Sequence, residues 1–207
     1  MSSDRTSARL SRRDSALARR QLILDAACLL IFERGFEAVS LTEIGAVAGV
    51  SGPAIYRHFA SKADLLAVLC GQTIDRLIEL VGPRQDDPAR ELEALVAGQV
   101  RLVVAYPQLV RVFEDEQRSL PEDLRRQVRR REREHAQRWV EALRDLNPGA
   151  RTQDLELVAY AAVGMILSAP RWPRGLRSDA QAQAGLLAAA RRILLPYLPA
   201  ATPPRLA

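Results

Sequence analysis

Side chains that can bind an anion gather in one short stretch of this chain, between residues 42 and 62. They are hydroxyl, phenol, guanidinium, imidazole and ammonium groups, carried by Thr42, Ser51, Tyr56, Arg57, His58 and Lys62. Groups of these kinds donate hydrogen bonds to phosphate oxygens and to the edges of bases. Catalysis is not indicated, because the sequence has no Gly-rich phosphate loop, no GxSxG and no HExxH, and its only histidines are His58 and His135. We therefore expect a binding protein rather than an enzyme, with no metal and no cofactor.

The elements that carry these side chains begin with a short helix from about residue 42. Thr42 is its expected N-cap, because a threonine hydroxyl can accept one of the unpaired N–H groups of the first turn. Ile44, Val47 and Ala48 follow at helical spacing and give the helix one apolar face. Gly49 then supplies the break that ends it.

A second short helix follows directly, with Ser51 as its N-cap. Pro53 lies in the first turn, where a missing N–H costs nothing. Ile55 and Phe59 point inward at i and i+4, and Ser61 caps a long third helix. A short helix with polar tips, supported by another helix, is the helix-turn-helix arrangement that enters the major groove of DNA.

This block resembles the DNA-binding signature of the TetR family of transcriptional regulators. The residues that carry the resemblance are Thr42, Ile44, Ala48-Gly49-Val50-Ser51, Ile55-Tyr56, His58-Phe59, Ser61-Lys62 and Leu65-Leu66. One departure is Gly45, where the family usually has alanine; a glycine inside a helix destabilises it by roughly 0.5–1 kcal/mol.

The resemblance implies a recognition helix over residues 52–58 and a role for each exposed residue around it. It places Thr42, Ser51, Tyr56, His58 and Lys62 at or near backbone phosphates. The bases are then read by Gly52, Pro53, Ala54 and Arg57, of which only the arginine can bind guanine in a bidentate way. Two-fold symmetry implies a palindromic operator, bound by a homodimer.

Composition agrees with an all-α fold of about nine helices. Of the 207 residues, 48% are hydrophobic and 5% aromatic, and Ala, Leu, Arg and Glu, all helix formers, are abundant. We expect a three-helix DNA-binding head over residues 17–61 and a helical effector-binding and dimerisation domain over residues 62–196. A disordered tail is expected over residues 197–207.

Residues 1–16 are expected to form a disordered basic arm. Six Arg stand against two Asp within the first twenty residues, and the net charge of the whole chain is +5. Such an arm either lies along phosphates or in a minor groove, or it is simply a solvated tail.

Two C-terminal helices, expected at about residues 152–168 and 178–195, are apolar enough to form an interface. Residues 155–167 are apolar almost all round, so that helix must be covered on every side. One explanation is a four-helix bundle shared by two subunits, as the family resemblance implies. The other is a central helix buried within a monomer.

The Arg-rich helix over residues 122–146 carries the candidate effector contacts. Arg131 and His135 interrupt its inward apolar stripe, and a buried charge needs a partner. That partner is either a ligand carboxylate or phosphate, or an internal acid such as Glu114, Asp115 or Glu116. The expected pocket walls are Tyr106, Leu109, Phe113, His135, Trp139 and Met165, which are otherwise ordinary core residues. The outer set, Arg125, Arg126, Arg129, Arg130, Arg133 and Arg138, is interpreted as a solvated face or as a seat for the phosphates of coenzyme A.

Two effector classes remain open. The stretch from residue 106 to 139 faintly resembles TetR-family regulators that sense acyl-coenzyme A esters in lipid and steroid catabolism, and this class is slightly favoured. A hydrophobic drug or cation, as in regulators of efflux, is the alternative, although its pocket wants acidic walls. A third possibility is a ligand-independent DNA-binding protein. Repression is the family default.

The cysteines and the hydropathy place the protein in the cytoplasm. Cys28 and Cys70 form no CxxC and no Cys/His cluster, so they indicate neither zinc nor a disulfide. The longest apolar run, residues 157–169, is too short to span a bilayer comfortably. We expect no membrane association.

Overall fold

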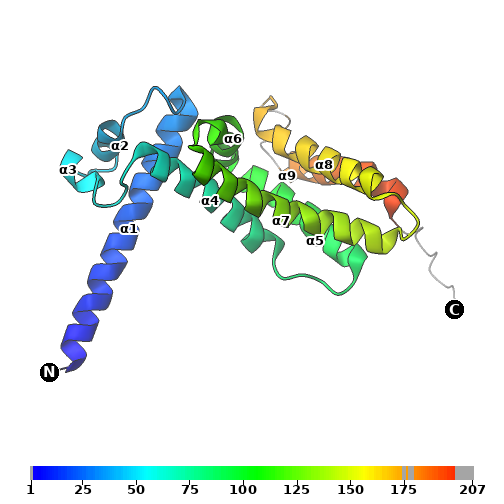
Figure 1. The fold of residues 1–207 in the computed structure, drawn as a ribbon, viewed down its shortest axis with the longest axis horizontal. Helices are drawn as coiled ribbons and strands as arrows, with labels where there is room; N and C mark the ends of the chain where they lie inside the picture. The colour runs from blue at the N-terminus through cyan, green and yellow to red at the C-terminus, as the bar shows by residue number, and fades with distance from the viewer. Residues whose placement is uncertain (1, 174–175, 177–179, 199–207) are drawn as a thin grey trace. The chain divides into compact units, whose positions relative to one another are not determined.

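The structure, a computed structural model, describes residues 2–173, 176 and 180–198, and the side chains of residues 15–173, 176 and 181–198. The described chain is all α-helical, as the sequence predicts (Figure 1). Its nine α-helices are α1 (Ser2–Arg34), α2 (Leu41–Val47), α3 (Gly52–Ile55), α4 (Lys62–Val81), α5 (Pro88–Ala105), α6 (Pro107–Glu116), α7 (Glu122–Leu146), α8 (Thr152–Ser168) and α9 (Ala180–Leu194). Short 3-10 helices, η1 (Gln117–Ser119), η2 (Ala169–Arg171) and η4 (Leu195–Tyr197), complete the fold.

The chain divides into two compact units, each with its own core. The head unit comprises residues 1–72 and 111–126, and the body unit comprises residues 73–110 and 127–207. The end of α6, η1 and the start of α7 therefore belong with the head, which the expected boundary at residue 61 did not anticipate. The expected tail lies outside the described residues from position 199 onward.

Helix α1 differs from the expectation, because it begins at Ser2 rather than near Leu17. Residues 2–16, expected as a disordered arm, are helical. The segment contains neither Gly nor Pro and includes four Arg, so no strong helix breaker stops the helix from continuing towards the N-terminus.

The head unit is built on the buried face of α1. Ile23, Ala27 and Ile31 are at most 2% exposed and repeat at helical spacing. Helix α2 packs against α1 and against α3, as Figure 1 shows. Buried residues Ile44 and Ile55 supply the apolar contacts of these short helices. Two elements too short to be stable alone are thereby held by a long one.

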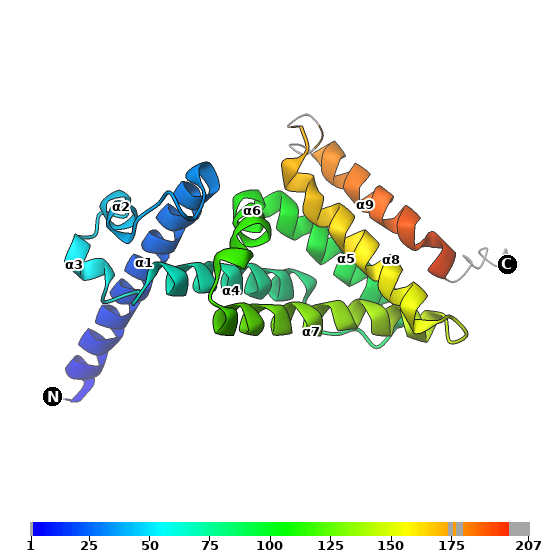
Figure 2. The ribbon, with the colours of Figure 1, turned by 45° about the horizontal axis from the view of Figure 1, so that its top comes forward.

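In the body unit, α5, α8 and α9 pack against one another (Figures 1 and 2). Their core is joined by Trp139 of α7, which is fully buried. Helix α8 is apolar on two faces, as expected. Its buried face carries Leu155, Ala159, Ala162 and Ile166, while Leu157 and Tyr160 are 71% and 59% exposed.

Gly98 of α5 lies in close contact with Val81, the last residue of α4. A Cβ atom built on Gly98 would lie 2.4 Å from Val81 Cγ2 and 2.8 Å from the Val81 Cα. Because the second contact is with backbone, rotation of a side chain cannot relieve it. Only glycine lets these two helices meet at this distance.

Gly98→Ala should lower the free energy of unfolding by about 1–3 kcal/mol, because the extra methyl group forces α4 and α5 apart. Gly149→Ala is the matched control, since no atom lies within 4 Å of its added Cβ. Urea denaturation of both variants measures the difference. Equal stability of the two variants would contradict this packing.

Candidate nucleic-acid interface and effector site

Helix α2 is capped by Ser40, and the prediction of Thr42 as N-cap is wrong. The Ser40 Oγ accepts from the Glu43 backbone N–H at 3.2 Å, and Glu43 Oε2 accepts from the Ser40 backbone N–H at 2.8 Å. This reciprocal pair is a capping box. Thr42 is the second residue of α2, two positions after the cap, and its side chain is exposed. The Ser-x-x-Glu spacing of residues 40–43 was a readable signal that the sequence analysis passed over.

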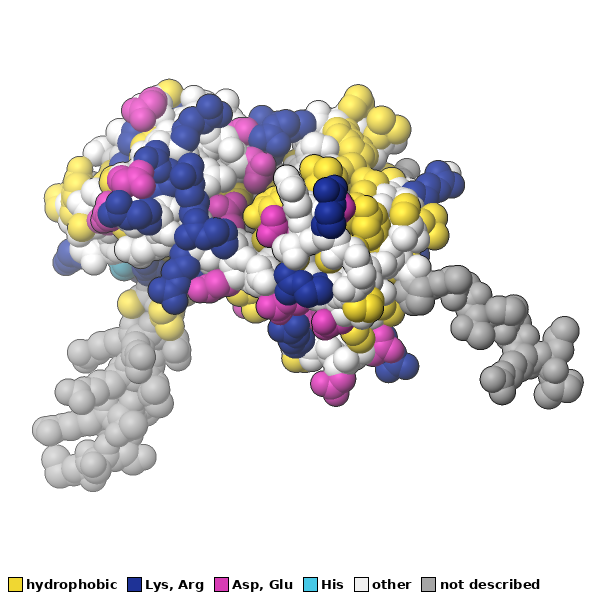
Figure 3. Space-filling view, turned by 45° about the vertical axis from the view of Figure 1, so that its right-hand side comes forward, with side chains coloured by type: hydrophobic (Ala, Val, Ile, Leu, Met, Phe, Trp, Pro, Cys, Tyr) yellow, Lys and Arg dark blue, Asp and Glu magenta, His cyan; other side chains and the backbone are white. Residues whose placement is uncertain are grey.

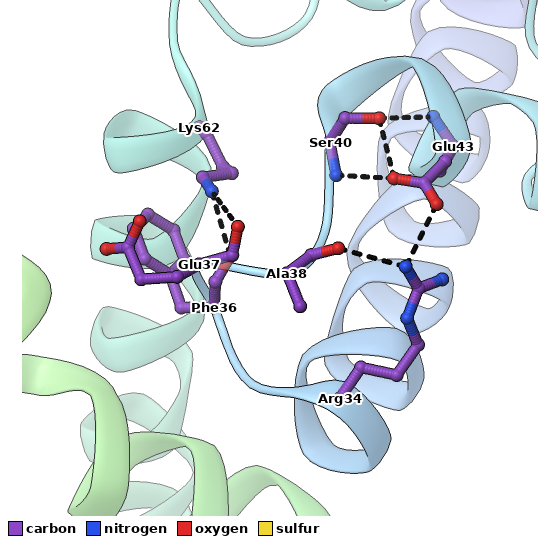
Figure 4. Close-up of polar contacts among 7 residues, drawn as sticks. All are labelled: Arg34, Phe36, Glu37, Ala38, Ser40, Glu43 and Lys62. Atoms are coloured by element: carbon purple, nitrogen blue, oxygen red, sulfur yellow. Dashed lines mark hydrogen bonds and ion pairs between the residues drawn. The ribbon is translucent and has the colours of Figure 1, made fainter.

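The loop between α1 and α2 is held by two cations (Figure 4). Arg34 Nη2 donates to the Ala38 carbonyl at 2.9 Å and to Glu43 Oε1 at 3.0 Å. From the other side, Lys62 Nζ donates to the Phe36 carbonyl at 2.8 Å and lies 4.2 Å from the centre of the Phe36 ring. The carbonyls of a loop without regular structure are thus paired with side chains of α1 and α4.

Lys62 therefore has a structural role that the sequence analysis missed. Its ammonium also reaches the Glu37 carbonyl at 3.5 Å. An ammonium carries three N–H donors, and these two carbonyls account for two of them. The expected contact with a phosphate is not tested by this arrangement.

The turn between α2 and α3 depends on two glycines. Gly49 has φ +66°, in the left-handed region that other residues enter at a cost, and it ends α2. The Val50 N–H donates to the Gly45 carbonyl at 2.8 Å, and a Cβ on Gly45 would lie 3.0 Å from the Val50 carbonyl oxygen. The family's usual alanine would press on that oxygen, so Gly45 allows a tighter turn here.

Helix α3 is shorter than the predicted recognition helix. It covers residues 52–55 with Ser51 as N-cap, as expected, and Pro53 in its first turn. Residues 56–58 continue as tighter turns, in which Arg57 N–H donates to the Ala54 carbonyl at 3.2 Å. Phe59, 3% exposed, then anchors the segment in the head.

None of the residues that are expected to contact DNA is buried. Thr42, Ser51, Pro53, Tyr56 and Arg57 are exposed, and Gly52, Ala54 and His58 are half-buried. Tyr56 is 56% exposed although it is aromatic.

The buried face of α2 differs from the prediction. Val47, which was expected on this face, is 58% exposed, and Leu41 and Gly45 are buried together with Ile44.

In the body unit, Arg131 and His135 have different environments. Arg131 is a half-exposed residue that forms an ion pair with Asp75 of α4. His135 is 8% exposed, and its Nε2 accepts from Trp139 Nε1 at 3.2 Å. Burial, and then the charge of Arg138, lower the pKa of His135 to about 4, so the imidazole is neutral at pH 7.

Arg138, expected on a solvated face, is instead largely buried. Its Nε donates to Glu91 Oε1 at 2.8 Å, and the Glu91 carboxylate is 2% exposed. Burial alone raises the pKa of Glu91, but hydrogen bonds from Arg138 and from the Gln85 N–H outweigh it and hold the pKa below its usual value. Helical periodicity alone could not reveal that an acid of α5 lies opposite this arginine.

The remaining candidate pocket residues are divided between the units. Tyr106 and Met165 are half-buried and pack against the same core as Trp139. The Arg76 guanidinium lies 5.6 Å from the centre of the Tyr106 ring. Phe113 is 5% exposed and belongs to the head unit. Leu109 is half-buried on α6.

Within the described residues there is no cluster of three or more potential metal ligands. No helix in this part of the chain is long and apolar enough to cross a bilayer. Neither Cys28 nor Cys70 forms a disulfide in the described part of the chain, and burial raises the pKa of Cys28 to about 11.

Comparison with known proteins gives two family matches. Residues 23–69 match the model for bacterial regulatory proteins of the tetR family, and residues 85–194 match a model for a tetracyclin repressor-like C-terminal domain. The second match covers more than half of the chain.

Among curated proteins, the chain is 32% identical over 106 residues to the HTH-type transcriptional repressor KstR2 of Rhodococcus jostii, covering 49% of this chain and 52% of that protein. It is 39% identical over 67 residues to the transcriptional activator FasR of Mycolicibacterium smegmatis, covering 32% and 30%. The first match spans about half the length of its relative and the second less.

Among solved structures, AibR in complex with isovaleryl coenzyme A and operator DNA aligns with a TM-score of 0.72 at 24% identity, over 83% of this chain and 97% of that one. KstR2 of Mycobacterium tuberculosis aligns with a TM-score of 0.70 at 22% identity, over 86% and 94%. At these identities the likeness concerns the fold.

Ser40→Ala should lower the free energy of unfolding by about 1 kcal/mol at pH 7, because α2 loses its N-cap. Thr42→Ala is the matched control and should be nearly neutral, since its hydroxyl is outside the cap. Denaturation with urea compares them. Equal losses would contradict the assignment of the cap to Ser40.

The same cap has a signature in acid. The Ser40 hydroxyl, then the Ser40 N–H and Arg34, lower the pKa of Glu43 to about 2. Because this pKa is depressed on folding, the stabilisation is complete above the usual carboxyl pKa and is lost as pH falls towards 2. Carboxyl NMR titration of Ser40→Ala should show the pKa of Glu43 moved upward, and that of Thr42→Ala unchanged.

Proposed function

The chain belongs to the TetR family of bacterial regulatory proteins, and from this we propose that it binds a DNA operator as a homodimer and is released by a small-molecule effector in the body unit. The family consists of transcriptional regulators and not enzymes. The observation that carries the proposal is the head: a capped α2 supports α3, and the polar side chains that flank α3, those of Ser51, Tyr56 and Arg57, are exposed.

Phosphate binding is assigned to the exposed groups around the two short helices. The exposed hydroxyls of Thr42 and Ser51 and the phenol of Tyr56 can donate to phosphate oxygens, and Ser51 makes no side-chain hydrogen bond to cap α3. His58 adds an imidazole beside them. Arg57 is the base-reading side chain, because guanidinium donates two parallel hydrogen bonds to guanine. Gly52, Pro53 and Ala54 allow close approach and apolar contact with the base edges.

Repression is the favoured mode. The matched KstR2 is named a repressor, and it covers a larger share of the chain than the matched activator FasR. A repressor needs only to occupy its operator, which the two heads of a homodimer are able to do without a further protein. Activation is the alternative.

Dimerisation is assigned to the exposed faces of α8 and α9. Hydrophobic side chains reach the surface of the body unit (Figure 3). On α8, Leu157 and Tyr160 are 71% and 59% exposed. Small residues, Ala161 and Gly164 on α8 and Ala184, Gly185 and Ala188 on α9, are exposed around them. A second copy would cover this apolar surface, and the small residues would let the helices meet closely.

An ester of coenzyme A is the favoured effector class, and a hydrophobic drug or cation is the alternative. AibR, similar in fold, was solved with isovaleryl coenzyme A. A cation would need an acidic partner, but the buried Glu91 is already bonded to Arg138 and to the Gln85 N–H. Helix α4 contributes residues to both units, so it is the proposed route by which effector and DNA weaken each other reciprocally.

Selection from a pool of random DNA duplexes with purified protein tests the proposal. A palindromic site is expected, with half-sites in successive major grooves. Arg57→Ala should then lose about 1–3 kcal/mol of discrimination at one base pair of each half-site. Tyr56→Phe should weaken operator and unrelated duplexes alike.

Arg129→Ala is the control, because it removes the same charge from an exposed position on α7. If it relaxes the selected sequence as much as Arg57→Ala does, Arg57 does not read the bases. If the wild-type protein enriches no site, the proposed function is wrong.

Leu157→Arg should weaken self-association at least tenfold, because a charge would enter the apolar dimer surface. Leu22→Arg on α1 is matched in chemistry and exposure, with its leucine 57% exposed against 71% for Leu157. Sedimentation equilibrium measures both variants. A Leu157→Arg protein that stays dimeric would exclude this face of α8.

A further inference from the structure

A cluster of buried polar side chains from α5 and α7 contains hydrogen-bond donors that have no acceptor among the described residues. Glu91 is 2% exposed, His135 is 8% exposed, and Arg138 lies beside them. The Glu91 carboxylate is fully engaged: Oε1 accepts from Arg138 Nε at 2.8 Å and Oε2 accepts from the Gln85 N–H at 2.9 Å. Two nitrogens of the cluster are nevertheless buried without a hydrogen-bond partner in the described part of the chain, His135 Nδ1 and Arg138 Nη2.

Trp139 fixes the proton of His135. An indole N–H can only donate, so His135 Nε2, 3.2 Å away, must accept and carries no proton. The neutral imidazole then has its proton on Nδ1. The unpartnered Nδ1 is therefore a hydrogen-bond donor, and Trp139 is the positioning residue that makes it one.

Arg138 supplies a second donor beside the first. Its Nε is bonded to Glu91 and its Nη1 lies 3.4 Å from the Gly82 carbonyl, which leaves Nη2. Residues three apart on a helix share a face, so both donors project from the same side of α7. A buried donor without an acceptor pays the full cost of losing water, so the two donors call for an oxygen between them.

The charge of the cluster decides what kind of oxygen that is. Arg138 is balanced by Glu91, and His135 is neutral, so the cluster has no net charge to offer. A carboxylate or phosphate would arrive as an uncompensated buried anion. A cation would meet two N–H donors and a carboxylate that is already bonded. A carbonyl oxygen is neutral and has two lone pairs for two donors.

We propose that His135 Nδ1–H and Arg138 Nη2–H donate hydrogen bonds to a neutral carbonyl oxygen of the effector, that of an ester or thioester rather than of a free acid. The inference rests on the proposed function and deepens it by naming the group that the effector presents. It also explains why these two donors remain unpaired in the body unit, where Gln99 Oε1 of α5 is a further buried atom without a hydrogen-bond partner among the described residues.

Nitrogen NMR of the imidazole rings tests this directly, because His58 and His135 are the only histidines. The probes are S-ethyl thioacetate and ethyl acetate, with acetate and ethylammonium at equal concentration. We expect an Nδ1–H tautomer for His135 whose Nδ1 resonance moves with the two neutral carbonyls. The shift with acetate or ethylammonium should be at least tenfold smaller, and His58 should not respond.

Two variants separate the positioning role of Trp139 from general packing. Trp139→Phe removes the N–H that fixes the tautomer, so His135 should populate the Nε2–H form and its response to S-ethyl thioacetate should fall several-fold. Trp172→Phe is the matched control: Trp172 Nε1 donates to Ser168 Oγ at 3.0 Å, away from the cluster, and the response should be unchanged.

Several results would overturn the proposal. An Nε2–H tautomer in the wild-type protein would remove the donor. An equal response to acetate would mean an anion site, and no response to any probe would mean that the donors hold internal water only. Operator selection uses no ligand, so a failure there is a failure of the proposed function and is distinct from these outcomes.

Discussion

The position of α3, the proposed DNA-reading helix, depends on how three carbonyl groups of one irregular loop are held. Residues 36–38 lie between α1 and α2, outside regular secondary structure, and the Phe36 carbonyl accepts a 3.4 Å hydrogen bond from the Val39 N–H. Arg34 donates a hydrogen bond to the carbonyl of Ala38, and Lys62 donates to the carbonyls of Phe36 and Glu37 (Figure 4). Since the same arginine also binds the carboxylate of the α2 capping box, one connected network ties α1, α2 and α4 together. Helix α3 is only four residues long and packs against α2, so its position depends on that network.

A second constraint acts inside the helix-turn-helix. The turn closes because Gly45 tolerates the Val50 carbonyl at close range and Gly49 adopts a positive φ. In the body, by contrast, the helices are held by the close contact of Gly98 with Val81 and by the buried ion pair of Glu91 and Arg138. The head thus fixes geometry with hydrogen bonds to backbone, whereas the body fixes it with packing and one buried ion pair. Each strategy suits its task, because a surface that reads DNA must leave its polar side chains exposed.

Periodicity was sufficient for the fold class and for the buried positions of Ile55 and Phe59. Periodicity and capping rules failed where two candidates compete locally, as when Ser40 rather than Thr42 caps α2, or where helix propensity continues, as in α1 before Leu17. They also failed wherever the deciding partner is distant in sequence: Asp75 for Arg131, Glu91 for Arg138, and the loop carbonyls for Lys62. Such pairs follow from how the helices pack, and one sequence does not encode them in a local pattern. The roles assigned to individual residues at DNA stay proposals for the same reason, since no local pattern identifies their partners.

The most direct test of this account is the salt dependence of DNA binding by Lys62→Met, measured together with its free energy of unfolding. If Lys62 acts by holding the loop and not also through its expected phosphate contact, the variant should be less stable and should bind operator and unrelated duplexes more weakly. The slope of log K against log salt concentration should then be unchanged, because no phosphate contact is lost. Unchanged stability with a slope reduced by about one would contradict the account, because Lys62 would then be a phosphate ligand and not the residue that positions the head.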